Sequence, residues 1–125
     1  WIDFGNKKVF LDAYNANPSS VSVGLESFAS IKGTKAVLLG DMLELGSHSL
    51  KEHLNIFEYA VTFNFDELFV CGPEFISANP SYPFKFEHVD SLLAWLDTHP
   101  IQSDFIYVKG SRGMKMEKVL EHFKA

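Results

Sequence analysis

Four side chains at one strand-to-helix corner could bind a nucleoside. Asp12, Tyr14, Asn15 and Asn17 follow the apolar run Val9–Leu11. An aspartate can accept hydrogen bonds from the vicinal hydroxyls of a ribose, as acidic residues do in dinucleotide-binding folds, and a tyrosine can stack on a base. Aspartate and asparagine also satisfy local backbone groups in turns and at helix starts. The corner therefore predicts either a nucleotide site or a capping turn.

A second segment has the composition of an anion-binding loop. It contains Lys109, Ser111 and Arg112 together with two glycines, Gly110 and Gly113. The cations supply charge, the serine supplies a donor, and the glycines permit a positive φ and close approach of the backbone. A helix that begins after the loop would add free N–H groups and a positive dipole end. We expect a carboxylate or phosphate here, and the alternative is a glycine-rich turn with two solvated cations.

Acidic and imidazole groups in the middle of the chain form no recognisable metal or catalytic motif. Asp41 and Glu44 lie in the loop 40–47 and suggest a metal site only weakly, since helix capping and loop solvation also explain them. His48 and His53 are five residues apart, which is the wrong spacing for two zinc ligands on one helix face. No nucleophile–histidine–acid arrangement and no phosphate-binding loop motif occurs. We therefore expect no catalytic residue and no metal ligand in this chain.

Apolar runs alternate with helical patterns and would position these polar segments. The runs cover residues 8–11, 35–39, 68–71 and 105–108. This alternation predicts an α/β fold with a mostly parallel sheet. Because right-handed crossovers place the carboxyl ends of parallel strands at one edge, the loops after the four strands are expected to meet there.

Shorter patterns predict local structure. The segment Trp1–Phe4 and the turn at Gly5–Asn6 predict a small hairpin with the strand that follows. Asn17 and Pro18 are typical of a helix start, and Asp90 is expected to cap a later helix. The helix over about 49–64 is expected to bury one apolar face, formed by Leu50, Leu54, Phe57 and Val61.

The composition is that of a globular domain. The 125 residues are 46% hydrophobic and 22% charged, as in ordinary soluble proteins, and the net charge of −5 disfavours a nucleic-acid partner. No apolar run of about 18 residues and no signal peptide occurs. The single cysteine, Cys71, is expected to be a buried structural thiol, which fits a cytoplasmic location. The chain starts at Trp1 and not at Met, so we expect a domain of a longer protein.

Three segments together resemble the C-terminal domain of the Mur ligases. They are Asp12-Ala-Tyr-Asn-Ala-Asn-Pro-Ser-Ser, Leu39-Gly-Asp-Met-Leu-Glu-Leu-Gly and Val108-Lys-Gly-Ser-Arg-Gly-Met-Lys-Met-Glu. Their order and spacing agree with the family over essentially the whole chain. His53 also matches a histidine that follows the second segment in this family. Within the family, the branch that adds D-alanyl-D-alanine is the most similar.

The resemblance implies a ligase of peptidoglycan-precursor synthesis in the bacterial cytoplasm. Such an enzyme uses ATP and Mg²⁺ to phosphorylate the terminal carboxylate of UDP-N-acetylmuramoyl-tripeptide, and the amine of D-Ala-D-Ala attacks the acyl phosphate. Residues 1–125 would form its Rossmann-like third domain, with about six strands, one antiparallel, and helices on both faces. The UDP-sugar domain and the central ATPase domain, which holds the triphosphate and the metal, would precede it. The resemblance thus predicts a monomeric chain that is inactive by itself.

The resemblance also divides the site residues between two ligands. The nucleotide would be bound by Asp12, Tyr14, Asn15 and Asn17. The incoming dipeptide would be bound by Lys109, Ser111 and Arg112, in a pocket shaped by Asp41 and Met42.

Two alternatives stay open. A free-standing flavodoxin-like signalling module of the receiver type needs a cluster of acids after the first strand, whereas Asp12 is followed by amides. It also needs a phosphorylatable aspartate at a middle strand end, where Cys71 ends the third run. The equivalent domain of a folate-polyglutamating ligase would share the fold but should lack the Tyr-Asn-Ala-Asn-Pro corner.

Overall fold

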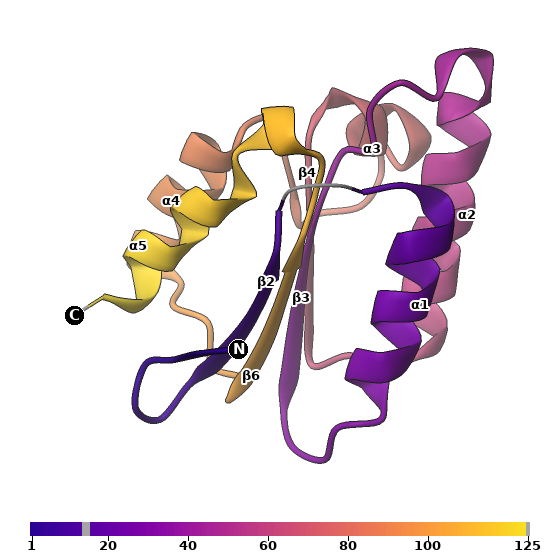
Figure 1. Cartoon of the computed structure of the whole chain (residues 1–125). Coiled ribbons are helices and arrows are strands. Elements are labelled where there is room, and N and C mark those ends of the chain that lie inside the picture. The colour runs from indigo at the N-terminus through magenta and orange to yellow at the C-terminus, as the bar shows by residue number, and fades with distance from the viewer. Residues whose placement is uncertain (14–15, 125) are drawn as a thin grey trace.

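A six-stranded sheet lies between two helical layers in the computed structural model, which describes residues 1–13 and 16–124 (Figure 1). The strand order is β1-β2-β6-β3-β4-β5. β1 is antiparallel to β2, and every other neighbouring pair is parallel. The predicted three-layer α/β domain with one antiparallel strand is confirmed.

The observed elements follow the apolar runs and helical patterns of the sequence. The strands are β1 (Ile2–Asp3), β2 (Lys8–Asp12), β3 (Lys35–Gly40), β4 (Glu67–Cys71), β5 (Lys85–Phe86) and β6 (Phe105–Lys109). The helices are α1 (Pro18–Ala29), α2 (Ser49–Thr62), α3 (Pro73–Ala78), α4 (Val89–Thr98) and α5 (Leu120–Phe123). Short 3₁₀ helices cover Gly46–His48, Arg112–Met114 and Met116–Val119. The predicted hairpin and the four predicted strands are confirmed.

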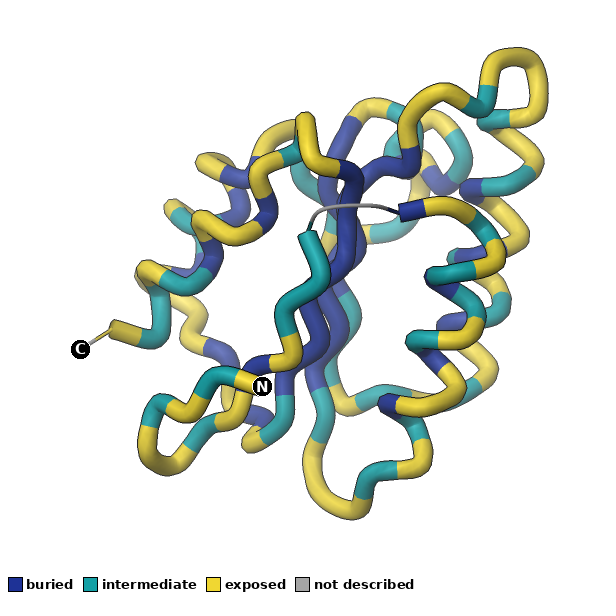
Figure 2. Tube along the Cα trace, in the orientation of Figure 1, coloured by how far each residue is buried: buried dark blue, intermediate teal, exposed yellow. Residues whose placement is uncertain are grey.

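Both faces of the sheet are covered, so its central strands read as continuous apolar runs. Helices α1, α2 and α3 cover one face, and α4, α5 and the last 3₁₀ helix cover the other (Figures 1 and 2). Side chains alternate between these layers along each strand. Val37, Leu39 and Tyr107 join the first layer, whereas Ala36, Leu38, Ile106 and Val108 join the second. Cys71 is buried as predicted, and burial raises the pKa of its thiol to about 12.

Helix α2 buries a different face from the one predicted. Its buried residues are His53, Ile56 and Ala60, whereas three of the four positions expected to be buried are exposed, namely Leu50, Leu54 and Val61. The expected Phe57 is only partly buried. Apolar periodicity does not predict this face, because the face includes a histidine, His53, whose ring nitrogens have hydrogen-bond partners inside the fold.

Two further local predictions are wrong. Helix α4 begins at Val89 after His88, so Asp90 lies in the first turn and does not cap the helix. The final helical pattern is divided, since Lys115 adopts a left-handed conformation with φ of 54° and two 3₁₀ helices precede α5. In the described ranges, no helix is both long and apolar enough to cross a membrane.

Candidate functional site

The loops after β2, β3, β4 and β6 meet at the carboxyl edge of the sheet, as predicted. The Asp41 N–H donates to the carbonyl of Cys71 at 3.0 Å, and the Ser111 N–H donates to the carbonyl of Asp41 at 3.1 Å. The Lys109 ammonium donates to Asp12 Oδ2 at 2.6 Å. These contacts join the three motif segments, which are separated along the chain, into one continuous edge.

Two glycines allow the loops after β3 and β6 to touch. A Cβ on Gly110 would lie 2.7 Å from Met116 Cγ and 3.1 Å from the Cα of Gly40, which is closer than real Cβ atoms normally come. Close backbone approach is therefore confirmed. The positive φ that glycine permits is not used here, because neither Gly110 nor Gly113 has a positive φ.

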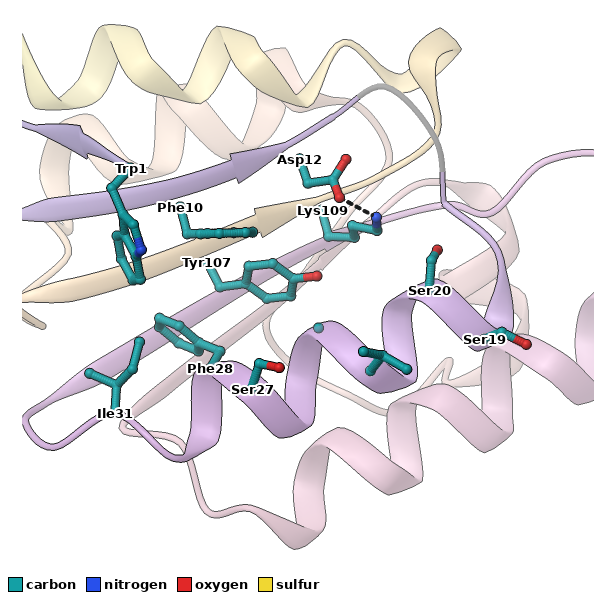
Figure 3. Close-up of a pocket in the computed structure, with 12 residues that line it drawn as sticks. Trp1, Phe10, Asp12, Ser19, Ser20, Ser27, Phe28, Ile31, Tyr107 and Lys109 are labelled. Carbon is teal, nitrogen blue, oxygen red and sulfur yellow. Dashed lines mark hydrogen bonds and ion pairs between the residues drawn. The ribbon is translucent and has the colours of Figure 1, made fainter.

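Asp12 and Lys109 form one ion pair, although the family resemblance assigned them to different ligands. They are register partners at the ends of β2 and β6, and their side chains point toward each other beside α1 (Figure 3). The Lys109 side chain is 3% exposed and the Asp12 side chain is 42% exposed. The pair therefore presents a carboxylate to solvent and holds the ammonium behind it.

The loop after β6 continues with Ser111 and Arg112, but no long helix comes after it. Ser111 is buried, and its hydroxyl oxygen accepts from the Leu43 N–H at 2.9 Å. Arg112 is exposed and begins a 3₁₀ helix of three residues. The predicted helix N-terminus for anion binding is therefore wrong, because a single 3₁₀ turn has no sizeable dipole.

The corner after β2 contains a capping turn. The Asn17 side chain accepts from the Ser20 N–H at 3.0 Å, and the Ser20 hydroxyl accepts from the Asn17 N–H at 3.1 Å. This reciprocal capping box starts α1, with Pro18 as its first residue. The helix start predicted from Asn17 and Pro18 is confirmed. Tyr14 and Asn15, which were also predicted to bind the nucleotide, lie outside the described residues.

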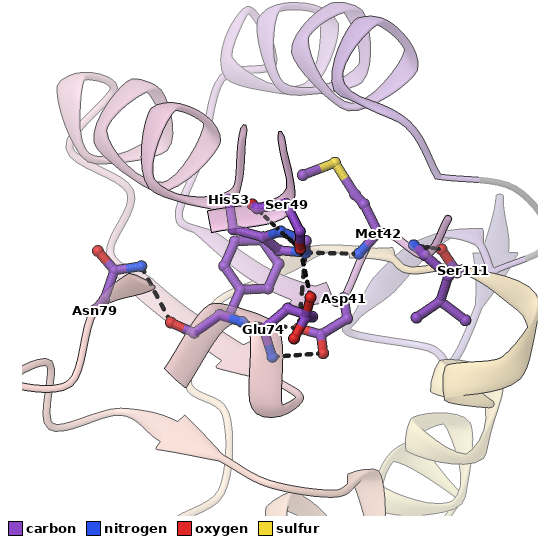
Figure 4. Close-up of polar contacts among 9 residues, drawn as sticks. Asp41, Met42, Ser49, His53, Glu74, Asn79 and Ser111 are labelled. Atoms are coloured by element: carbon purple, nitrogen blue, oxygen red, sulfur yellow. Dashed lines mark hydrogen bonds and ion pairs between the residues drawn. The ribbon is translucent and has the colours of Figure 1, made fainter. Parts of the chain in front are cut away.

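Asp41 has no exposed surface and is used by the fold itself. Its Oδ2 accepts from the Glu74 N–H at 2.8 Å, and its Oδ1 accepts from the Phe75 N–H at 2.9 Å (Figure 4). Burial raises the pKa of the Asp41 carboxyl, while these two N–H groups lower it. A Cβ at Gly72 would overlap the carboxylate. The capping alternative for Asp41 is confirmed, and the residue caps α3.

His53 lies in the same buried network and fixes the loop after β3. Its Nε2 accepts from the Met42 N–H at 2.9 Å, which leaves Nδ1 to carry the proton and donate to the Ser49 carbonyl at 2.7 Å. The Met42 side chain is also buried. Asp41 and Met42 were expected to shape the ligand pocket at this edge, and the structure places both side chains inside the fold beneath the edge.

Comparison with known proteins decides the family. A family model described as "Mur ligase, glutamate ligase domain" matches residues 2–112. The chain belongs to the Mur ligase family. Within the residues that the structure describes, no group of three or more histidine, cysteine, aspartate or glutamate side chains could hold a metal ion.

Curated relatives of this Mur ligase domain carry the name UDP-N-acetylmuramoyl-tripeptide–D-alanyl-D-alanine ligase. The relative from Treponema pallidum is 35% identical over 118 residues, which are 87% of this chain and 26% of the relative. The relative from Bacillus subtilis is 31% identical over 120 residues, which are 88% of this chain and 26% of the relative. The chain therefore spans about a quarter of the length of these relatives.

Solved structures share the fold. MurF from Acinetobacter baumannii superimposes with a TM-score of 0.84 at 23% identity, covering 99% of this chain and 29% of that one. MurF ligase from Thermotoga maritima, solved in complex with ADP, superimposes with a TM-score of 0.74 at 26% identity. That match covers 92% of this chain and 27% of the Thermotoga chain.

Sequence reasoning missed an aromatic groove in this Mur ligase domain. The groove has a volume of about 680 Å³ and runs between α1 and the strands β2 and β6 (Figure 3). Phe10 and Asp12 line it from β2, and Tyr107 and Lys109 line it from β6. Both pairs have the spacing of two residues that marks one face of a strand. That spacing could have revealed the groove if the two strands had been recognised as neighbours.

Proposed function

We propose that this chain is the C-terminal domain of an ATP-dependent ligase that adds D-Ala-D-Ala to UDP-N-acetylmuramoyl-tripeptide. The terminal carboxylate of the tripeptide takes the γ-phosphoryl group of ATP, which leaves as ADP. The amine of D-Ala-D-Ala then attacks the acyl phosphate, forms the amide and releases phosphate. The main support is that a relative named for this reaction matches 87% of this chain at 35% identity, while the loops at the carboxyl edge expose the Asp12 carboxylate there.

Asp12 is proposed to bind the ribose of ATP. Lys109 contacts Oδ2 of Asp12, and in the described part of the chain no donor contacts Oδ1. The Asp12 side chain is 42% exposed, so its carboxylate can accept hydrogen bonds from vicinal hydroxyls. Because Lys109 is buried and its charge is matched by Asp12, we propose that it orients the carboxylate and does not bind the dipeptide. The capping box of Asn17 fixes the corner next to Asp12.

Arg112 is proposed to bind the carboxylate of D-Ala-D-Ala. It is exposed at the same edge, and a guanidinium group can bind a carboxylate through two parallel hydrogen bonds. Ser111 holds this loop against the loop after β3 through its contact with Leu43. Asp41 and Met42 support the edge from within.

ATP supplies the phosphoryl group, and Mg²⁺ would neutralise the charge of its phosphates. We propose that residues of preceding domains hold the triphosphate and the metal, since the described residues here offer a ribose acceptor but no metal-binding cluster. This domain would close over the nucleotide, exclude water from the acyl phosphate and orient the amine. A monomeric enzyme in the bacterial cytoplasm, near its nucleotide-linked substrate, fits this function.

The test is ligation by the full-length protein, with the 125-residue chain alone as the control. We expect ATP-dependent formation of the pentapeptide product from UDP-N-acetylmuramoyl-tripeptide and D-Ala-D-Ala, with phosphate release only when both substrates are present. The chain alone should release no phosphate. Addition of glutamate to a folate substrate in place of D-Ala-D-Ala would favour the folate-polyglutamating alternative. Phosphate release from ATP by the chain alone would contradict this division of labour between domains.

A further inference from the structure

The buried side of α2 carries a histidine at a position where an apolar side chain would need no hydrogen-bond partners. His53 has no exposed surface, and Ile56 and Ala60 continue the same buried face. Its ring packs edge-on against Phe75, with the ring centroids 4.7 Å apart. Burial of an imidazole is unfavourable unless its ring nitrogens have partners, so the partners show what the residue does in the fold.

One partner of His53 belongs to the loop after β3. The Met42 N–H donates to His53 Nε2 at 2.9 Å, and His53 Nδ1 donates to the Ser49 carbonyl at 2.7 Å (Figure 4). The Ser49 contact stays within α2, whereas the Met42 contact joins the helix to the carboxyl edge of the sheet. An apolar side chain at position 53 would leave the Met42 N–H without this acceptor.

Met42 lies between the two residues that hold Ser111. The Ser111 N–H donates to the Asp41 carbonyl at 3.1 Å, and the Ser111 hydroxyl oxygen accepts from the Leu43 N–H at 2.9 Å. The imidazole therefore fixes the middle residue of a three-residue segment whose two ends both contact Ser111. Because Arg112 follows Ser111 directly, a displacement of this segment would also displace Arg112.

The nucleotide side of the edge is held by other contacts. The Asp12 carboxylate is paired with Lys109, its register partner across β2 and β6. Within residues 1–13 and 16–124, no hydrogen bond joins residues 41–43 to Asp12. A displacement of residues 41–43 should therefore act on Arg112 and leave Asp12 in place.

We propose that His53 is a positioning residue for the incoming dipeptide. Through the Met42 N–H, its imidazole sets the place of the loop that contains Ser111 and Arg112. The inference rests on the proposed function, in which Arg112 binds the carboxylate of D-Ala-D-Ala. His53 is buried beneath the edge, so its loss weakens binding of the dipeptide indirectly and leaves binding of ATP unchanged.

Steady-state kinetics of three variants of the full-length protein test the proposal. His53→Gln keeps an acceptor at about the reach of Nε2. His53→Asn is the matched control, since its shorter amide can still contact the Ser49 carbonyl but cannot reach Met42, and His53→Leu removes both contacts. We expect His53→Asn and His53→Leu to raise KM for D-Ala-D-Ala at least about fivefold and His53→Gln to change it less than about twofold. KM for ATP should change less than about twofold in all three variants.

Amide hydrogen exchange in the 125-residue chain follows the loop itself. The Leu43 amide should exchange at least about tenfold faster in His53→Asn and His53→Leu than in wild type, and at nearly the wild-type rate in His53→Gln. The Leu38 amide, in the middle of β3, is the internal reference and should change little. A general loss of stability would speed exchange at both amides, so the comparison separates it from a displaced loop.

Equal Leu43 exchange in wild type and all three variants would overturn the proposal, whatever the activity. It would also be overturned if KM for ATP rose as much as KM for D-Ala-D-Ala, or if neither rose in folded His53→Asn and His53→Leu. Failure of both of these variants to fold would show a role in folding alone and would likewise overturn it. Absence of ligation by the wild-type protein would instead contradict the proposed reaction, and the exchange rates would still decide whether His53 sets the place of the loop.

Discussion

Asp12 and Asp41 stand at equivalent places in the sheet and have opposite surroundings. Asp12 ends β2, and Asp41 comes directly after β3, so both lie at the carboxyl edge of parallel strands. Asp12 is half exposed and has one ion-pair partner, Lys109. Asp41 is fully buried and accepts two backbone N–H groups at the start of α3.

The two aspartates differ in the segment that each neighbouring strand leads into. Beside Asp41, β4 leads through Gly72, with φ of 124°, directly into α3, and this turn brings two N–H groups onto the carboxylate. Beside Asp12, β6 leads into the glycine-containing loop of Ser111 and Arg112 and not directly into a long helix. An aspartate at the carboxyl edge is therefore available to a ligand only where its carboxylate does not already accept hydrogen bonds from the N-terminus of a helix.

The largest expected effect is a loss of stability on replacing Asp41. Asp41→Ala leaves the N–H groups of Glu74 and Phe75 buried without an acceptor, which should cost about 3 kcal/mol of unfolding free energy. Asp12→Asn, which keeps an oxygen for Lys109, should cost less than about 1 kcal/mol. Denaturant unfolding of the 125-residue chain measures both. Similar losses of unfolding free energy for Asp41→Ala and Asp12→Asn would contradict the view that Asp41, unlike Asp12, is needed for the fold.

A smaller loss of stability is expected on disturbing the contact between Gly110 and Gly40, which joins the loops after β6 and β3. Gly110→Ala forces a methyl group against Met116 and the backbone of Gly40, which should cost about 2 kcal/mol. Gly113→Ala is the matched control, since its Cβ would meet only the tip of Leu43, at 3.2 Å. The same denaturant unfolding reports both. If Gly113→Ala proved as costly as Gly110→Ala, close approach of the backbones would not be the reason.

Removing the charge of Lys109 should change stability still less. Lys109→Met keeps most of the buried volume and leaves Asp12 free to be solvated, so the unfolding free energy should change by less than about 1 kcal/mol. In the full-length protein the same variant should raise KM for ATP, because Asp12 is no longer oriented. Unchanged KM for ATP together with a raised KM for D-Ala-D-Ala would indicate that Lys109 binds the dipeptide.

The smallest effect concerns His122, far from both aspartates. Burial lowers the pKa of His122, whose Nε2 accepts from the Ile101 N–H at 3.3 Å. As pH falls below about 6.5, the His122 imidazole is therefore protonated more readily in the unfolded chain than in the folded chain. The contribution of His122 to stability is present above that pH and lost below it.

Unfolding of the wild-type chain and of His122→Gln between pH 7.5 and 5.5 isolates this contribution. The difference between their unfolding free energies should shrink as pH falls. Asp41, whose pKa is raised, contributes with the opposite sign in both proteins and cancels in the difference. A difference independent of pH would show that His122 is not involved.

The meeting of the polar loops at the carboxyl edge of the sheet could be predicted from sequence, whereas the side-chain contacts among them could not. Apolar runs followed by polar loops predict parallel strands whose carboxyl ends meet, and the capping pattern of Asn17 and Pro18 is local. The Asp12–Lys109 pair depends on β6 inserting between β2 and β3, which no local pattern encodes. The burial of His53 depends on partners contributed by the loop after β3. The sequence therefore indicated which residues lie at the carboxyl edge, but not which of their side chains are buried and hydrogen-bonded within the fold.

Steady-state kinetics of the full-length protein with Asp12→Asn and Asp41→Asn test the central contrast most directly. Asp12→Asn should lower kcat/KM for ATP by at least about tenfold, or 1.4 kcal/mol, with little change in its unfolding midpoint. Asp41→Asn should lower the unfolding midpoint and, wherever the protein stays folded, leave kcat/KM for ATP within about threefold of wild type. An unaffected Asp12→Asn enzyme, or a folded Asp41→Asn enzyme with the larger loss of kcat/KM, would contradict the assignment of Asp12 to the nucleotide and Asp41 to the fold.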